Sequence, residues 1–449
     1  MAKTSGVPPQ APTAPGRVPL LGHVPRLLRN PVGTLRKLRS RGGVVTLYIG
    51  TKPVYLVNSP QLLHKVLVTE AASYAKGRMY DKARPVVGNG LATSQGAFHH
   101  RQRRLMAPAF RRERLHAYAE VMRRQAEAMT STWRDGQRLA MDKALHRVAA
   151  AIAFTALFGA DLDEEAVDEI DLCVAGFLKE VAVRTVSPGF VEKLHTPGSR
   201  RFNRLRERMT EIVETMIDAH LKDPDSRQDL LSMLVSAADE TTGATMSAQQ
   251  LHDEVMTLLV SAPDTTGSTM SWLFYELGRR PQMQRRLQAE VDAVLDGRPV
   301  AFDDVAELEY TRRLVDETLR LHAVSWLQMR RTLKPVELGD VRLPAGAEIL
   351  FSAAALHRDP HLYPDPLRFD PDRWASPPPR ETFIPFSAGP RKCIADHFAR
   401  LQMTIVTATV AADWRTRLLP SPRVREVPAA VLRPNHLPMT VHTRHRTPS

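Results

Sequence analysis

Residues 386–395 read Phe-Ser-Ala-Gly-Pro-Arg-Lys-Cys-Ile-Ala and place one cysteine, Cys393, at the end of a loop that contains glycine and proline. An apolar stretch with helical periodicity follows, so backbone N–H groups and a helix N-terminus are expected near the sulfur. Both stabilise a thiolate, the form of cysteine that binds iron. A single thiolate cannot build an iron–sulfur cluster or a structural zinc site, which need several ligands, but it can be the axial ligand of a haem.

The alternative interpretation of an isolated cysteine is a buried apolar side chain. That is our interpretation of Cys173, which lies in the helical context Ile-Asp-Leu-Cys-Val. The chain of 449 residues has two cysteines in total, too few for a disulfide framework. A reducing, cytoplasmic location is therefore expected.

The composition is that of an ordinary globular protein, with 43% apolar and 25% charged residues and a formal net charge of +13. Excess positive charge suits nucleic acid, an anionic membrane or an acidic protein. The arginines of residues 101–112 alternate with apolar residues, as on a solvated helix face, and no nucleic-acid-binding motif accompanies them. No apolar run approaches the roughly 20 residues of a membrane helix. We expect neither a nucleic-acid partner nor a membrane span.

The N-terminal segment is rich in proline. Residues 1–18 predict an extended, mobile lead-in, because proline blocks both helices and sheet ladders. No internal repeat and no linker divides the remaining chain. Residues 19–449 are therefore expected to form one large domain.

Helical periodicity dominates from residue 61 to about residue 331 and returns at residues 395–411. The clearest helices are expected at residues 201–221, 247–279 and 281–295. Short β-branched runs bounded by turn residues predict a hairpin at residues 44–57 and strands at residues 336–343, 348–351 and 424–441, with a turn at residues 344–346. The predicted fold class is mainly α with a small β portion.

The pattern Phe386-x-x-Gly389-x-Arg391-x-Cys393 resembles the haem-ligand loop of the cytochrome P450 monooxygenases. From average residue usage, a chance match to these four residues in a chain of this length has odds on the order of one in a thousand. The resemblance covers nearly the whole chain, from about residue 19 to residue 441. It implies the cytochrome P450 fold and a haem b whose iron is ligated by Cys393, with Phe386 in the loop that binds the cofactor.

Two further segments resemble motifs of the same family that concern the fold. Glu317 and Arg320 share a helical face and match its Glu-x-x-Arg motif. Arg373, in the sequence Phe-Asp-Pro-Asp-Arg-Trp, matches the second arginine of the family's Glu–Arg–Arg cluster. Taken alone, such a pair is an ordinary surface contact. Ahead of the cysteine loop, the resemblance favours a buried structural cluster.

A third segment, Ser-Ala-Pro-Asp-Thr-Thr at residues 261–266, resembles the family's oxygen-activation helix. The resemblance makes Asp264 and Thr265 an acid–alcohol pair that relays protons during O–O cleavage. The alternative is a polar, cap-like interruption of an apolar helix. Pro263 departs from the family pattern, and we expect it to kink the helix and to free the carbonyl of Leu259.

The resemblance also implies four partners for the two haem propionates. His99 and Arg103 match the family's Trp/His-x-x-x-Arg helix, Arg330 follows the Glu317 helix, and Arg391 lies in the cysteine loop. The planar fork of arginine suits a carboxylate well. Each of the four has an alternative interpretation as a solvated surface residue.

The reaction implied by the resemblance is insertion of one oxygen atom from O2 into a C–H bond of a small apolar substrate. Electrons would come from a ferredoxin and a ferredoxin reductase, and an acidic ferredoxin on a basic face near Cys393 would account for the positive net charge. The whole chain is similar to actinobacterial oxidases of sesquiterpene hydrocarbons, which implies terpenoid and antibiotic biosynthesis. The alternative substrate is a macrolide or other polyketide, or a fatty acid.

The family's substrate pocket corresponds here to residues 79–87, 256–260 and 324–328. The last two segments are mostly apolar, whereas the first mixes Met79, Tyr80 and Val86 with charged residues. An apolar lining favours a hydrocarbon-like ligand. Arg78 and Arg84 either hold a substrate carboxylate or face solvent.

Two functions of other classes are alternatives. A haem or ligand carrier has no use for the Asp264–Thr265 pair. The paired acids Asp303 and Asp304 suit the magnesium and diphosphate of a terpene cyclase. Our interpretation of these two acids is an ordinary acidic helix start.

Overall fold

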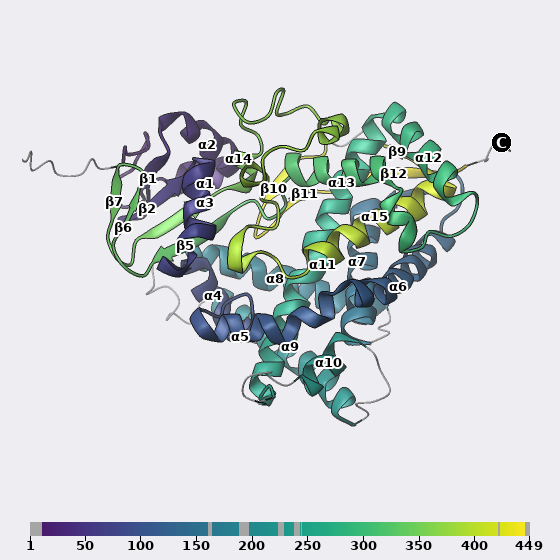
Figure 1. The fold of residues 1–449 in the computed structure, drawn as a ribbon, viewed down its shortest axis with the longest axis horizontal. Helices are drawn as coiled ribbons and strands as arrows, with labels where there is room; N and C mark the ends of the chain where they lie inside the picture. The colour runs from purple at the N-terminus through teal and green to yellow at the C-terminus, as the bar shows by residue number, and fades with distance from the viewer. Residues whose placement is uncertain are drawn as a thin grey trace, which may run out of the picture.

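A computed structural model of the chain describes residues 11–444 except 160–163, 188–196, 223–228, 238–242, 244 and 421–422. Helices fill most of the molecule, and a mixed sheet lies at one side (Figure 1). The predicted fold class, mainly α with a small β portion, is confirmed. Within the described ranges, no helix has the length and apolarity that crossing a membrane requires.

The predicted helices at residues 201–221, 247–279, 281–295 and 395–411 are present as α9, α11, α12 and α15. The α-helices are α1 (Val24–Arg29), α2 (Pro31–Leu38), α3 (Pro60–His64), α4 (Arg78–Val87), α5 (Gly96–Met106), α6 (Arg112–Ser131), α7 (Met141–Phe158), α8 (Glu164–Val186), α9 (Pro197–Lys222), α10 (Leu230–Ser236), α11 (Ala248–Arg279), α12 (Pro281–Leu295), α13 (Glu309–Leu321), α14 (Ala353–Leu356) and α15 (Asp396–Asp413).

The longest of these helices, α11, begins at a reciprocal cap. The Ser247 hydroxyl accepts a hydrogen bond from the Gln250 N–H at 3.2 Å, and the Gln250 side chain accepts one from the Ser247 N–H at 3.1 Å. This capping box satisfies two N–H groups that a helix start otherwise leaves unpaired. The helix is continuous through Pro263. Pro263, where a kink was expected, therefore does not divide α11 into two helices.

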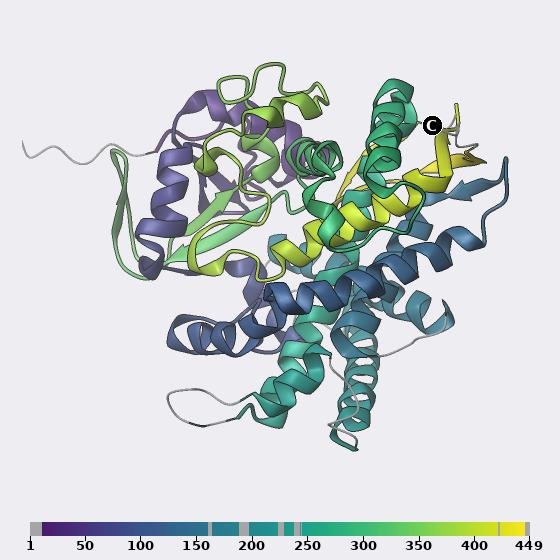
Figure 2. The same ribbon diagram turned by 45° about the vertical axis from the view of Figure 1, so that its right-hand side comes forward.

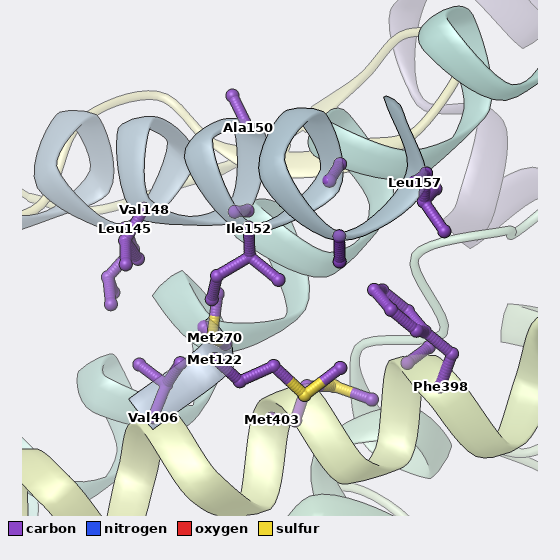
Figure 3. Close-up of a cluster of buried hydrophobic side chains, with 14 of the residues drawn as sticks. Met122, Leu145, Val148, Ala150, Ile152, Leu157, Met270, Phe398, Met403 and Val406 are labelled. Carbon is purple, nitrogen blue, oxygen red and sulfur yellow. The ribbon is translucent and has the colours of Figure 1, made fainter. Parts of the chain in front are cut away.

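The helical core forms where α6, α7, α11 and α15 pack together. Figure 2 shows α6 (blue) lying alongside α15 (yellow-green). In Figure 3, Ile152 points from α7 toward Met403 of α15, with Met122 and Met270 beside them. All four side chains are buried. Flexible methionines fill irregular gaps between crossing helices, and burying these side chains holds α11 in place.

The main sheet has five strands in the order β1-β2-β8-β5-β3. In it, β2 and β8 are parallel, and the other neighbours are antiparallel. Its strands are β1 (Val44–Ile49), β2 (Lys52–Val57), β3 (Tyr74–Lys76), β5 (Gln328–Thr332) and β8 (Glu348–Phe351). The strands of the three smaller sheets are β4 (Arg138–Ala140), β6 (Val336–Leu338), β7 (Val341–Leu343), β9 (Trp414–Leu418), β10 (Glu426–Pro428), β11 (Leu432–Pro434) and β12 (Pro438–Thr443).

The strand predictions were confirmed in part. The hairpin at residues 44–57 is β1 and β2. The run at 336–343 is itself a hairpin, β6 and β7, that turns at Gly339 with φ +59°, whereas β8 joins the main sheet. Three strands, β3, β4 and β5, lie in the span predicted to be helical. The β5 sequence Gln-Met-Arg-Arg-Thr has no strand alternation, and only its pairing with β8 and β3 makes it a strand.

Residues 11–14 belong to the predicted lead-in and lie along the edge of β1. The Ala14 N–H donates to the Thr46 carbonyl at 2.9 Å, and the Thr46 N–H donates to the Pro12 carbonyl at 2.8 Å. Ala11 and Ala14 are buried. These contacts hold this part of the lead-in on the sheet, and residues 1–10 lie outside the described residues.

The predicted charge cluster is confirmed as a buried one. Glu317 and Arg320 of α13 are both 0% exposed and form two parallel hydrogen bonds of 2.8 Å. Arg373 donates to the same carboxylate at 3.2 Å, and so does the Trp374 indole at 3.0 Å, which the sequence did not predict. Arg320 also donates to carbonyl oxygens of the segment that leads to the cysteine loop, those of His357, Pro366 and Arg368.

Replacing Glu317 by glutamine leaves the charge of Arg320 buried without a carboxylate. Breaking a buried ion pair in this way costs about 3–5 kcal/mol. We therefore expect Glu317→Gln to lower the free energy of unfolding by about that amount in urea denaturation of the cofactor-containing protein. The control is Glu309→Gln on the same helix, which breaks an exposed pair with Arg313 and should cost less than about 1 kcal/mol. Equal losses in both variants would contradict the buried role.

Candidate functional site

A cavity of about 410 Å³ lies between the cysteine loop and α11. Its walls come from β3, α4, α5, α7, α8, α11, α13, α15 and residues 324–328 and 430–431. Of the eight predicted site residues, seven line it: His99, Arg103, Asp264, Thr265, Phe386, Arg391 and Cys393. The fold thus gathers residues that are almost 300 positions apart in the sequence around one space.

The cysteine loop is closed by backbone hydrogen bonds. The Cys393 N–H donates to the Phe386 carbonyl at 2.9 Å, and the Lys392 N–H donates to the Gly389 carbonyl at 3.0 Å. Gly389 has φ +69°, and a Cβ atom there would lie 1.9 Å from the Leu67 carbonyl oxygen. Only glycine fits this position, because both the backbone conformation and the available space exclude a side chain. The loop shape is therefore set by packing against residues 65–69.

Cys393 is exposed although it lies deep within the molecule, because its surface opens into the cavity. Burial raises the pKa of its thiol. The N–H of Ala395 and the charges of Arg103 and Lys392 act in the opposite direction. The N–H group that was expected to stabilise a thiolate is present, together with these positive charges, but burial raises the pKa of the thiol more than they lower it. A coordinating metal ion would deprotonate such a thiol outright.

His99 and Arg391 carry nitrogen atoms that the protein leaves unsatisfied. His99 Nδ1 lies 3.2 Å from the Ser94 hydroxyl, whereas Nε2 has no hydrogen-bond partner among the described residues, and neither has Arg391 Nη1. Burial and the charge of Lys76 lower the pKa of His99 to about 4, and burial and Arg330 lower that of Arg391 to about 10. The unsatisfied Arg391 N–H group next to the cavity is suited to an anionic ligand, and so is His99 Nε2 in the tautomer that carries its proton there.

The other two predicted arginines take different positions. Arg103 of α5 lines the cavity and donates to the Lys392 carbonyl at 2.6 Å, which ties α5 to the cysteine loop. Arg330 of β5 is buried but does not line the cavity. Its guanidinium donates to the Met329 carbonyl at 2.8 Å and lies 3.5 Å from the Ser387 hydroxyl. It therefore acts on the cavity through its charge.

A buried lysine completes this basic cluster and was missed by the sequence analysis. Lys76 lines the cavity, and its Nζ donates to the carbonyls of Leu91, at 3.0 Å, and Ala92. Burial, Arg330 and Arg391 together lower its pKa well below the usual value. No local pattern marks this lysine, because it reaches the cluster only through the pairing of β3 with β5, which places it opposite Arg330.

A stripe of hydroxyl groups from α11 lines the opposite wall. Each donates to the carbonyl four residues earlier: Ser261 to Thr257 at 2.6 Å, Thr265 to Ser261 at 2.9 Å, and Thr269 to Thr265 at 2.8 Å. Their protons therefore point into the helix, and their oxygen lone pairs remain available to accept hydrogen bonds from the cavity.

Asp264 lies on the same helix, and it is buried at 7% exposure. It contributes to the cavity wall, but its carboxylate also faces the neighbouring helix α7, where Oδ1 lies 3.4 Å from His146 Nε2. The predicted acid–alcohol pair is therefore brought to the cavity, and its acid has a histidine partner that the sequence analysis did not predict.

Most of the apolar residues in the three segments predicted to form the substrate pocket line the cavity. The cavity-lining members are Met79, Tyr80, Ala83, Val87, Thr257, Leu258, Val260, Val324, Ser325, Leu327 and Gln328. Phe177, Leu178 and Val181 of α8 also line it and were missed, although their helical spacing marks one apolar face. Arg78 and Arg84 do not line the cavity. They donate to the backbone carbonyls of Ser187 and Thr93 instead.

The paired acids Asp303 and Asp304 begin a short 3₁₀ helix, as in the interpretation of an acidic helix start. Asp304 pairs with Arg298 and accepts a hydrogen bond from the Ala301 N–H at 2.7 Å. Over the ranges that the structure describes, no group of three or more His, Cys, Asp or Glu side chains is arranged to hold a metal ion.

Glu254 anchors the loop that forms one edge of the cavity. Its side chain is 0% exposed, and Oε2 accepts a hydrogen bond from the Leu91 N–H at 2.8 Å. Burial raises the pKa of this carboxyl to about 7, although the Leu91 N–H opposes the shift. Oε1 has no hydrogen-bond partner in the described part of the chain.

Comparison with known proteins assigns the chain to one family. The family model described as Cytochrome P450 matches residues 12–437. Cyclooctatin synthase from Streptomyces melanosporofaciens is 40% identical over 96% of this chain and 95% of its own length. Cyclooctat-9-en-7-ol 5-monooxygenase from the same species is 39% identical over 98% of both chains. Pentalenene oxygenase from Streptomyces avermitilis is 34% identical over 97% of this chain and 98% of its own.

The raised pKa of Glu254 makes the stability of the protein depend on pH. As pH rises from the usual carboxyl pKa of 4.5 to about 7, the unfolded chain ionises while the folded protein keeps Glu254 neutral, so the folded state loses stability. At pH 8 the loss reaches about 3 kcal/mol. Because glutamine cannot ionise, we expect Glu254→Gln to gain stability relative to the unmodified protein between pH 5 and pH 8 in urea unfolding. If the difference in stability between Glu254→Gln and the unmodified protein were the same at pH 5 and at pH 8, a raised pKa of Glu254 would be contradicted.

Proposed function

The chain belongs to the cytochrome P450 family and is an oxidoreductase of the monooxygenase class, and we propose that it binds haem b through Cys393 and oxidises a C–H bond of a terpene. The observation that carries this proposal is the position of Cys393, whose thiol opens into a cavity that Asp264 and Thr265 also line. A ligand carrier needs a cysteine that opens into a cavity, but it has no use for Asp264 and Thr265 in the wall.

The residues around the cavity fit a haem. The cofactor needs one thiolate for its iron and donors for two carboxylates. Cys393 offers the first, and the unsatisfied nitrogen atoms of His99 and Arg391 are suited to the second. We propose that Arg103 and Lys76 complete the set, with Arg330 contributing its charge from behind the wall. Phe386 would support the loop, since its carbonyl already fixes the Cys393 N–H.

The haem, when bound, supplies binding and reductive activation of O2. Asp264 and Thr265 would deliver the protons that this chemistry consumes. The Thr265 hydroxyl donates to the Ser261 carbonyl, so its oxygen is the atom that accepts a hydrogen bond from the cavity. Apolar side chains such as Leu258, Val260 and Leu327 would orient the substrate and exclude water.

The proposed substrate is a cyclic terpene, either a hydrocarbon, such as the sesquiterpene hydrocarbon that we expected from the sequence, or a terpene alcohol. Support comes from the names of the relatives, which are an oxygenase of pentalenene and a monooxygenase of cyclooctat-9-en-7-ol. The apolar walls agree with such a substrate. A fatty acid is disfavoured, because Arg78 and Arg84 are engaged by backbone carbonyls and do not reach the cavity. A macrolide has no specific observation in its favour.

We propose an acidic ferredoxin, reduced by a ferredoxin reductase, as the electron donor. A groove of about 1070 Å³ borders the cysteine loop at Gly389 and Lys392. Its charged lining contains Arg312, Arg313, Arg380, Lys392 and Arg400 against Glu309, Asp316 and Glu381. This excess of basic groups next to the loop that holds Cys393 suits a negatively charged partner.

The spectrum of the dithionite-reduced protein with carbon monoxide tests the cofactor. We expect a strongly red-shifted Soret band that is lost in Cys393→Ala, since a thiolate ligand produces that shift. The control is Cys173→Ala, which removes a buried thiol on α8 and should keep the band. Cyclic terpenes should then change the spin state of the resting protein. A band typical of histidine-ligated haem, or no haem, would overturn the proposal.

Ionic strength tests the partner. Because salt screens exposed charges over roughly 10 Å at 0.1 M, we expect turnover with a ferredoxin to fall several-fold between about 0.05 and 0.5 M salt while substrate binding stays constant. Arg380→Glu in the groove should weaken ferredoxin-supported turnover. Arg204→Glu, the same charge change on α9 away from the groove, should not. Turnover that is independent of salt and of both variants would count against docking at this face.

A further inference from the structure

His146 of α7 lies directly behind α11, on the side away from the cavity wall. The two helices approach closely at Gly267, where a Cβ atom would lie 2.9 Å from the Cα of His146. A glycine at this position allows the imidazole to reach across to the α11 residues on either side of it, Asp264 and Ser268. The contact is therefore built into the crossing of two core helices.

The hydrogen bonds of the imidazole determine which nitrogen titrates. Nδ1 lies 2.7 Å from the Asp142 carbonyl, which can only accept a hydrogen bond, so Nδ1 carries a proton. Nε2 faces the Asp264 carboxylate at 3.4 Å and the Ser268 hydroxyl at 3.2 Å. With a proton on Nε2, the ring forms an ion pair with Asp264. Without it, the Nε2 lone pair faces a carboxylate and repels it.

Charged groups from two neighbouring helices and one strand bear on this pair. Asp264 comes from α11 and Asp171 from α8, and Arg433 of β11 acts on Asp171. Burial lowers the pKa of His146, but the hydrogen bond and charge of Asp264 raise it more, so the pKa lies above its usual value. The His146 side chain keeps 14% exposure, whereas Asp264 borders the cavity. The pair therefore extends from a partly exposed side chain of α7 to a residue of the cavity wall.

A second histidine with the same local geometry provides an internal reference. His220 Nδ1 lies 2.8 Å from the Met216 carbonyl, and Nε2 lies 3.0 Å from Asp229 Oδ2. Both side chains of this pair are at most 5% exposed, and neither lines the cavity. The pair joins α9 to α10 and has a structural role. What distinguishes His146 is that its carboxylate partner is also part of the cavity wall.

We propose that His146 is the positioning residue of Asp264, holding the carboxylate through its Nε2 proton and replenishing the proton that Asp264 delivers to the cavity. In this step the N–H bond at Nε2 breaks and an O–H bond forms at Asp264 Oδ1. The ring is left neutral with its proton on Nδ1. Solvent then returns a proton to Nε2. The inference rests on the proposed role of Asp264 in proton delivery.

The first test measures the His146 proton without turnover. Histidine-labelled, haem-containing protein is reduced and bound to carbon monoxide, which makes it diamagnetic, and the ring signals are followed by NMR from pH 5 to pH 9. We expect His146 to titrate above its usual pH range, and about one pH unit or more lower in Asp264→Asn. His220 should be the same in both proteins. An unchanged His146 titration in Asp264→Asn would overturn the inference.

The second test measures coupling, the product formed per NAD(P)H consumed, against pH. In the unmodified protein, coupling should fall as pH rises through the His146 pKa, because the Nε2 proton is lost. His146→Gln keeps an N–H group for Asp264 but holds no transferable proton. It should lower coupling on the order of tenfold and remove the pH dependence. His220→Gln, the matched control, should keep the profile of the unmodified protein.

The Asp264→Asn variant separates the possible failures. If Asp264→Asn loses coupling while His146→Gln keeps the unmodified profile, Asp264 delivers protons without His146, and only this inference fails. If Asp264→Asn keeps full coupling, the proposed role of Asp264 fails, and the inference fails with it.

Discussion

Buried positive charge without an equal negative charge is the constraint on which the rest of this structure depends. Lys76, Arg330 and Arg391 are brought together beside one cavity, with His99 kept neutral among them. Burying like charges close together is costly unless a ligand of opposite charge compensates them. Glu254, the nearby carboxylate, is itself driven toward its neutral form by burial. The arrangement is therefore one that a dianionic ligand would stabilise, as the two carboxylates of the proposed haem would.

Holding such a cavity open requires rigid walls, and two devices supply them. The Glu317–Arg320 pair joins α13 to the irregular segment before the cysteine loop, since Arg320 donates to three carbonyls of that segment. Gly389 then presses the cysteine loop onto the backbone of residues 65–69, at a distance that no side chain allows. The position of the Cys393 thiol follows from these two contacts. A buried charge network is suited to this task because none of its members can leave without exposing the others.

The central helix α11 presents different polar side chains on its two faces. Toward the cavity it presents hydroxyl groups whose protons are held by its own carbonyls, at Ser261, Thr265 and Thr269. Toward α7 it presents Asp264 and Ser268, which meet His146 at the close crossing allowed by Gly267. One helix thus separates a cavity suited to an apolar substrate from a buried polar contact, and Asp264 belongs to both. The proposed delivery of protons by Asp264 depends on that double position.

Much of this protein could be predicted from short stretches of sequence, because the signals involved act over a few residues. The loop around Cys393, the Glu317–Arg320 spacing and the helical periodicity of residues 247–279 are all local patterns. The positions of Lys76, His146 and Trp374, and the withdrawal of Arg330 behind the wall, had no such signal. Lys76 depends on the register of β3 against β5, and His146 depends on how closely α7 and α11 cross. Register and crossing distance emerge when the whole core packs, so only the tertiary structure decided which distant side chains would share the site.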